Sequence, residues 1–163
     1  MSIEKIYNLH FEKIYRFVYH LIGDQCQAED ITQETFVKLY YQINNDENIV
    51  NPKSWLYQVA SNLSKNFIKR KNILRRILSE SSARTDNIDD SLEENVIRSE
   101  KIKLLRKLLQ KLSARDQILL QLYNDDLSYK EIAEISKIKE KYVGTYISRA
   151  IIKCSKLFKK EQS

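Results

Sequence analysis

The residue types that most often carry out catalysis are few in this chain, and their spacing does not group them. The 163 residues include two cysteines and two histidines. Cys26 and Cys154 lie far apart, and we expect both to be small buried side chains in a reducing compartment. His10 and His20 are ten residues apart and lack an arrangement of Cys, Asp or Glu that would indicate a metal site, and no glycine-rich phosphate loop is present. We therefore expect no catalytic site, no metal, no cofactor and no small-molecule substrate.

A stretch rich in amides and cations points instead to nucleic acid. Six of the twelve residues from 65 to 76 are basic. Lys and Arg neutralise phosphates, and Asn amides can read base edges. This density favours nucleic acid over an ordinary solvated helix face. Four residues of this stretch recur with Asn62 at steps of three or four and share one helical stripe with it: Lys65, Asn66, Lys69 and Arg70.

Two aromatic residues, Trp55 and Tyr57, lie just before this stripe. Unpaired bases stack on aromatic rings, so Trp55 is a candidate stacking platform. A single Trp on an apolar helix face is more commonly part of the core. Both interpretations remain open, and they are compatible if one ring edge is exposed.

A second candidate site lies near the C-terminus, where the spacing predicts a helix-turn-helix. Ser128 and Glu131 fit the Ser-x-x-Glu capping box at the start of a short helix. A turn at 136–138, which lacks the usual glycine, leads to a long amphipathic helix. The alternative is a purely structural helical hairpin. The polar face of the long helix offers groups suited to DNA: Lys139, Lys141, Tyr142, Gly144, Thr145, Tyr146, Ser148 and Arg149.

Composition shows which elements must position these residues. With 2 Gly and 1 Pro, the chain has too few turn formers for a sandwich, a barrel or a Rossmann fold. We expect an all-α protein of two small helical domains, an N-terminal bundle at 1–78 and a C-terminal four-helix domain with the helix-turn-helix at 99–163. The acidic stretch at 79–98, which has no apolar period, is expected to be a flexible linker.

The position of Gly144 suggests a contact with DNA. A glycine inside a helix costs about 1 kcal/mol relative to Ala, and a close approach to a DNA backbone would explain Gly144.

The helix expected at 27–42 carries one polar patch. Its members, spaced three or four residues apart, are Asp30, Gln33 and Glu34. An ordinary solvated face is the simpler interpretation of that patch from its chemistry alone.

Taken together, three ordered motifs resemble bacterial RNA polymerase sigma factors of the extracytoplasmic-function group, within the sigma-70 family. The first runs from Ala28 to Phe36, and the second from Trp55 to Asn62 with the basic tail that follows. The third runs from Leu127 to Ile135 and continues with Val143 and with the Ser-Arg-Ala that ends at Ala150. The resemblance covers nearly the whole chain except the acidic stretch.

This resemblance implies a transcription initiation factor that binds core RNA polymerase, recognises a two-part promoter and performs no chemistry. Asp30, Gln33, Glu34 and Phe36 then fall at the positions that bind the polymerase clamp helices. The long helix, from Lys139 to Arg149, falls where the minus-thirty-five element is read. Residues at the positions that bind and melt the minus-ten element are Lys53, Trp55, Asn62, Lys65, Asn66, Lys69 and Arg70.

Some residues depart from the family pattern. Gly144, Tyr146 and Ile151 stand where members often have a basic residue, and Asn66 replaces a frequent Asp. An amide still donates and accepts hydrogen bonds, so capture of a flipped base remains compatible with Asn66.

The resemblance also implies partners and a location. It implies an anti-sigma factor, often membrane-anchored, and a cytoplasmic protein. The tail after Leu157 is short, so we expect this inhibitor to act in trans, with a helix placed between the two domains. Two rival functions remain: a helix-turn-helix repressor that acts without polymerase, and a metal-dependent nuclease, for which Asp30 and Glu34 are the candidate carboxylate pair.

Overall fold

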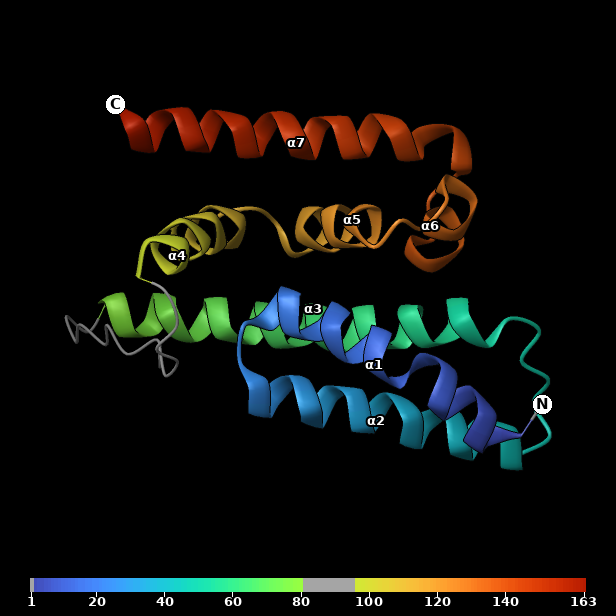
Figure 1. Cartoon of the computed structure of the whole chain (residues 1–163). Coiled ribbons are helices and arrows are strands. Elements are labelled where there is room, and N and C mark those ends of the chain that lie inside the picture. The colour runs from blue at the N-terminus through green and yellow to red at the C-terminus, as the bar shows by residue number, and fades with distance from the viewer. Residues whose placement is uncertain (1, 81–95) are drawn as a thin grey trace.

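The computed structural model describes residues 2–80 and 96–163, and every element in these ranges is a helix (Figure 1). The expected all-α class is confirmed. The N-terminal helices form the lower layers in Figure 1, and the C-terminal helices form the upper ones. The helices are α1 (Ile3–Ile22), α2 (Gln25–Asn44), α3 (Pro52–Glu80), α4 (Val96–Gln110), α5 (Ala114–Asn124), α6 (Tyr129–Ser136) and α7 (Glu140–Gln162).

Local signals in the sequence set the ends of the first three helices. Gly23 adopts φ 75° after α1 and donates its N–H to the Tyr19 carbonyl, as a helix C-cap requires. The Asp24 side chain then caps α2 by accepting the Gln27 N–H. At the start of α3, Asn51 Oδ1 accepts the Ser54 N–H at 3.2 Å, and Pro52 occupies the first helical position, where its missing N–H costs nothing.

Helices α1, α2 and α3 pack into an N-terminal bundle around fully buried side chains. Phe17 of α1 meets Tyr57 of α3 edge to face, with ring centroids 5.1 Å apart. Leu39 of α2 and Leu56 of α3 are both 0% exposed. This apolar core fixes the rotation of α3, so that its amide and basic stripe faces outward.

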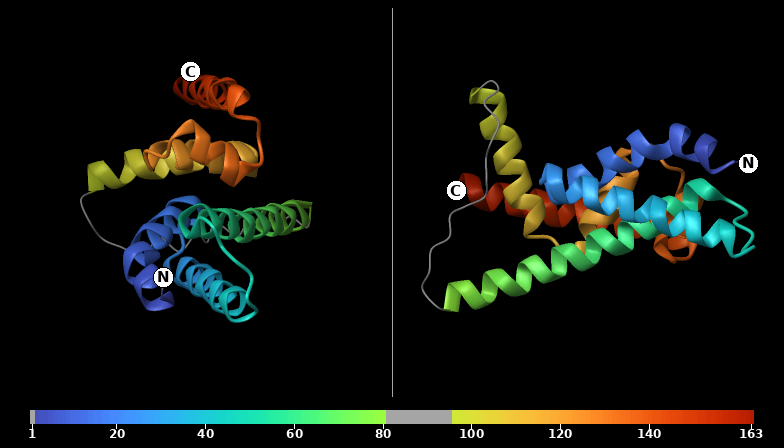
Figure 2. Two further views of the ribbon diagram at one scale, coloured as in Figure 1. Left: turned by 90° about the vertical axis from the view of Figure 1, so that its right-hand side faces the viewer. Right: turned by 90° about the horizontal axis from the view of Figure 1, so that it is seen from below.

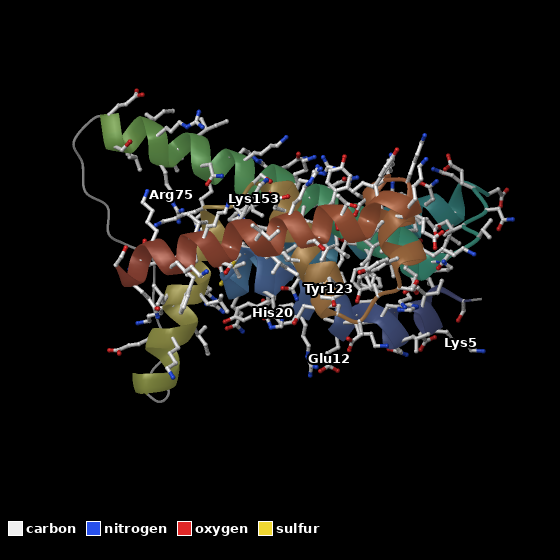
Figure 3. The ribbon with its side chains drawn as sticks, turned by 90° about the horizontal axis from the view of Figure 1, so that it is seen from above. Lys5, Glu12, His20, Arg75, Tyr123 and Lys153 are labelled. Carbon is white, nitrogen blue, oxygen red and sulfur yellow. The ribbon has the colours of Figure 1, made fainter. Side chains whose placement is uncertain are left out.

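Helices α4 to α7 form the C-terminal domain. Ser113 caps α5 through the Asp116 N–H, and Lys153 of α7, labelled in Figure 3, reaches the Asp116 carboxylate at 3.0 Å. The capping box at the start of α6 is present, with both of its hydrogen bonds formed. Lys137 ends α6 in the left-handed conformation at φ 55°, so a lysine takes the role for which a helix-turn-helix often uses glycine.

The two domains pack directly against each other, and their buried residues form one continuous apolar cluster. Helices α1 and α3 contact α5, and α3 also contacts α6. In Figure 2, α5 and α7 lie over the N-terminal helices, whereas α4 points away from them in the right-hand view. Because each domain covers apolar surface of the other, the chain is a closed molecule in this conformation.

A polar network crosses the same interface. The Gln121 amide nitrogen of α5 lies 3.2 Å from His20 Nδ1 of α1 and donates to Asp125 at 3.1 Å. Asp125 also meets the buried Tyr57 hydroxyl, and burial raises the pKa of both groups. Polar groups that pair in this way across a partly buried interface favour one relative placement of the two domains.

The expected linker at 79–98 falls mainly outside the described residues. Helix α3 continues through Glu80, two residues beyond the expected end of the N-terminal domain, and α4 begins at Val96, three residues before the expected start of the C-terminal domain. The described helices include none that is long and apolar enough to span a membrane.

Candidate nucleic-acid and polymerase interfaces

The polar patch expected on α2 is present at the surface. Asp30, Gln33 and Glu34 are all exposed, and Glu34 lies 3.8 Å from Lys38 in a solvent-facing pair. Phe36 is only 6% exposed. Its ring packs on Tyr7 and Phe11 of α1, with centroid distances of 5.0 and 5.6 Å. In this conformation Phe36 supports the patch from beneath and offers little surface of its own.

Apolar side chains extend this patch along α2. The spacing of apolar residues in α2 places Val37 and Tyr40 with the apolar positions of the helix, yet they are 51% and 50% exposed, and Tyr41 is 61% exposed. Val37 lies one turn beyond Gln33 and Glu34 on the same side of the helix, and Tyr40 and Tyr41 lie two turns beyond them. Tyr is enriched at the energetic centres of protein interfaces, so α2 presents a mixed polar and apolar surface suited to a protein partner.

The amide and basic stripe of α3 is also at the surface. Asn62, Asn66, Lys69 and Arg70 are exposed, and Lys65 is half-buried. Arg70 Nε donates to the Asn66 backbone carbonyl at 3.4 Å, so these residues lie together on one side of the helix. The stripe combines hydrogen-bonding amides with cations, as contact with a nucleic-acid strand requires.

The first turn of α3 is placed differently from the rest of the stripe. Trp55 is half-buried and packs against the core, so the two roles expected for it remain compatible. Lys53 Nζ lies 2.8 Å from Glu131 Oε1 of α6, and the hydrogen bond from Lys53 holds the pKa of Glu131 below its usual value. Ser54 Oγ donates to Glu134 Oε2 at 3.3 Å. This part of the candidate strand site is therefore covered by the other domain.

The helix-turn-helix presents its expected face to solvent. Val143, Ile147 and Ala150 of α7 are buried, which rotates the opposite side of the helix outward. Tyr146 is half-buried, and Arg115 of α5 lies over its ring at 4.2 Å from the centroid. Gly144 is also half-buried, and the remaining residues of this face are exposed: Lys139, Lys141, Tyr142, Thr145, Ser148 and Arg149.

The structure gives a packing reason for a glycine at position 144, which the sequence did not indicate. A Cβ atom built at Gly144 would lie 3.2 Å from Cε2 of Tyr129, the first residue of α6. Tyr129 is 45% exposed and lines a shallow cavity of about 740 Å³ with Glu140, Lys141, Gly144 and Thr145. The missing side chain thus lets the Tyr129 ring lie against α7, on the side that would face DNA.

The sequence did not indicate the contact between Arg115 and Tyr146, and the expectation that both cysteines are buried was wrong. Arg115 carries no local signal, because its partner Tyr146 lies far along the chain. Cys26 is exposed rather than buried, since it lies in the solvent-facing first turn of α2, and Cys154 is half-buried; both are free thiols. The described residues include no cluster of three or more His, Cys, Asp or Glu side chains that could hold a metal ion.

Comparison with known proteins matches each domain to a family. Residues 6–90 match the family described as Sigma-70 region 2, and residues 102–154 match Sigma-70, region 4. The chain is 30% identical over 157 residues to the ECF RNA polymerase sigma factor SigM of Bacillus subtilis (strain 168), covering 92% of this chain and 91% of that protein. It is 31% identical over 156 residues to SigW of the same strain, covering 88% and 82%.

A solved structure shares the fold. It is the co-crystal structure of the sigma factor RpoE in complex with the anti-sigma factor NepR from Bartonella quintana. The matched chain is 20% identical, with a TM-score of 0.67, and the match covers 96% of each chain.

Proposed function

Because the chain belongs to the extracytoplasmic-function group of the sigma-70 family, it directs RNA polymerase to promoters, and we propose that its two domains divide this task. It is a sigma factor and not an enzyme. The observation that carries this function is the order of the two family regions along one chain, the first covering nearly all of α1 to α3 and the second most of α4 to α7.

On this proposal, α2 binds core polymerase. Asp30, Gln33 and Glu34 supply exposed polar groups, and Val37 and Tyr41 add apolar surface beside them. A rim of polar groups around exposed aromatic and aliphatic side chains is the usual composition of a protein interface. The aromatic cluster beneath the patch, formed by Tyr7, Phe11 and Phe36, holds α2 against α1 and so fixes the position of the exposed residues.

The minus-ten element is assigned to α3. Asn62 and Asn66 offer amide groups to an extruded base, and Lys65, Lys69 and Arg70 neutralise the strand's phosphates. A pocket that holds an extruded base offsets part of the stacking energy that is lost when the duplex melts. Lys53 and Trp55 complete this site at the start of α3 once the C-terminal domain moves away.

The minus-thirty-five element is assigned to the outer face of α7. Thr145, Ser148 and Arg149 are exposed along one side of a helix long enough to enter the major groove. Lys139 and Lys141 lie at the start of the helix, where they can contact phosphates. Binding of both domains to one polymerase makes the second promoter contact effectively intramolecular.

Regulation and location are inferred from the family. The fold similarity to a sigma factor crystallised with an anti-sigma factor supports an inhibitory partner for this chain as well. We assign the protein to the cytoplasm, because its proposed partners, core polymerase and promoter DNA, are found there.

Reconstituted transcription with bacterial core polymerase on genomic fragments tests this function. The wild-type chain is expected to give discrete start sites that core polymerase alone does not give. The double variant Gln33→Ala with Glu34→Ala is expected to lose co-purification with core polymerase while keeping its helical fold. A matched control, Glu161→Ala with Gln162→Ala at the exposed end of α7, keeps binding. Unchanged co-purification of the α2 variant would show that the patch is only a solvated surface.

A further inference from the structure

The start of α3, to which the minus-ten strand is assigned, is occupied in this structure by two carboxylates of α6. Glu131 lies 2.8 Å from Lys53 Nζ, and Glu134 accepts a hydrogen bond from Ser54 Oγ at 3.3 Å. Both contacts are made in the first turn of α3, where the helix dipole favours negative charge. A cation and a hydroxyl at a helix N-terminus are also the groups that bind a nucleic-acid phosphate.

Glu131 has two roles, which its two oxygens share. Oε2 accepts the Ser128 N–H at 2.8 Å and closes the capping box of α6, while Oε1 reaches Lys53. The cap fixes the carboxylate in place before the domains meet, so little side-chain entropy is lost when it pairs with Lys53. The helix-turn-helix therefore carries a preformed anionic group directed at the N-terminal domain.

The rest of the interface holds these carboxylates in position. Around them lie the shared apolar cluster and the network of Tyr57, Asp125, Gln121 and His20. An isolated ion pair at a half-exposed surface would add little. Here it is one contact within a larger buried interface, and it lies at its edge, where the candidate strand site begins.

In the closed conformation one candidate DNA site is exposed and the start of the other is covered. The outer face of α7 stays exposed, with Thr145, Ser148 and Arg149 all accessible, whereas Lys53 and Ser54 of α3 are paired with carboxylates of α6. In this conformation the chain can contact duplex DNA through α7, but a single strand cannot enter the first turn of α3 without displacing Glu131 and Glu134.

We propose that α6 is an internal competitor for the minus-ten strand: Glu131 and Glu134 take the places of two phosphates and keep the free chain closed until the domains separate. The proposal rests on the assignment of that strand to α3. It places part of the inhibition within this chain, whereas the sequence pointed to an inhibitor acting only in trans.

The test compares single-strand binding by two charge-matched variants of the full chain. Glu131→Gln with Glu134→Gln removes both carboxylates, while the Gln oxygen at 131 can still accept the Ser128 N–H and preserve the cap. The control, Glu4→Gln with Glu12→Gln, removes two exposed charges from α1. The probe is a fluorescent single-stranded DNA 12-mer of random sequence, and the readout is fluorescence anisotropy without polymerase.

The α6 variant is expected to bind the probe about tenfold more tightly than the control, the factor that results when loss of the two contacts raises a small open fraction about tenfold. Equal affinity of the two variants would overturn the proposal. A second variant, Tyr57→Phe with Asp125→Asn, weakens the interface away from α3's first turn and keeps both α6 carboxylates. It should also bind more tightly than wild type if closure blocks the site, and not if the carboxylates act only by local repulsion.

The native cysteines allow closure to be measured separately. Cys26 lies in the N-terminal domain and Cys154 in the C-terminal domain, and both are free. A donor and acceptor dye pair on these thiols should show lower energy transfer in both interface variants than in wild type and control. Unchanged transfer in every variant would also overturn the proposal. Neither readout uses polymerase. A chain that opens as expected but does not support transcription would therefore refute the proposed function, while the proposal that α6 competes for the strand site would stand.

Discussion

Gly144 offers a prediction that separates two explanations for one residue. Glycine within a helix costs about 1 kcal/mol relative to alanine, so Gly144→Ala should stabilise the fold if the new methyl group meets nothing. The structure places Tyr129 Cε2 3.2 Å from that methyl position. Contact at this distance requires the ring to move by a few tenths of an ångström, which offsets part of the gain.

The expected magnitudes follow from this geometry. In the wild-type background, Gly144→Ala should raise the free energy of unfolding by only about 0–0.5 kcal/mol. In a Tyr129→Ala background the obstacle is gone, and the same change should give the full gain of about 1 kcal/mol. Urea denaturation followed by circular dichroism measures all four proteins of this double-mutant cycle.

A matched control removes the effect of helix propensity. Ser155→Ala lies at an exposed position of α7, so its gain should be the same in both backgrounds. If the gain from Gly144→Ala is also independent of Tyr129, the ring contact does not explain the glycine. A loss of affinity for promoter duplex in both backgrounds would then favour the alternative, in which Gly144 admits the DNA backbone.

Three further predictions concern the core, the linker and acid. Phe17→Ala should lower the free energy of unfolding by about 3–5 kcal/mol, measured by urea denaturation, because a ring with no exposed surface leaves a cavity. Limited proteolysis should cut first within 79–94, and the two fragments should elute together in gel filtration because the domains share a core; separate elution would contradict closure. The stabilising effect of Glu131 relative to Glu131→Gln should be present above its ordinary pKa of 4.5, because Lys53 lowers the pKa in the folded chain. This difference, measured by thermal denaturation, should disappear as the pH falls through the lowered pKa, and a difference that grows in acid would refute it.

The helices and their ends could be predicted because their signals are local. Ser113, Ser128 and Gly23 each act on backbone groups within four residues, so a pattern in one stretch of sequence is enough to place them. The exposed face of α7 follows in the same way from the apolar period of Val143, Ile147 and Ala150. The residues of each candidate DNA site could be predicted from their spacing, because each site lies on a single helix.

Contacts between distant segments could not be predicted in this way. Lys53 and Glu131 are 78 residues apart, and nothing near either residue indicates the other. Tyr129 against Gly144 and Arg115 over Tyr146 also depend on how α5, α6 and α7 pack. The exposure of Val37 and Tyr40 has the same origin, because periodicity gives the apolar side of a helix but not how much of it a neighbour covers.

Direct packing of the domains changes how an inhibitor would act. A helix inserted between them, as expected from the sequence, would have to displace the apolar cluster and the network that already fill the interface. A partner that binds the closed chain from outside faces no such cost, and it stabilises closure by its preference for that state. The exposed surface of α2, with Tyr40 and Tyr41, is open to such a partner and is also the surface assigned to polymerase. Polymerase and inhibitor would then compete for one surface with opposite preferences, polymerase for the open chain and inhibitor for the closed one. Variants that open the interface should therefore weaken the inhibitor and strengthen polymerase by related factors, since both ligands draw on the same closing equilibrium.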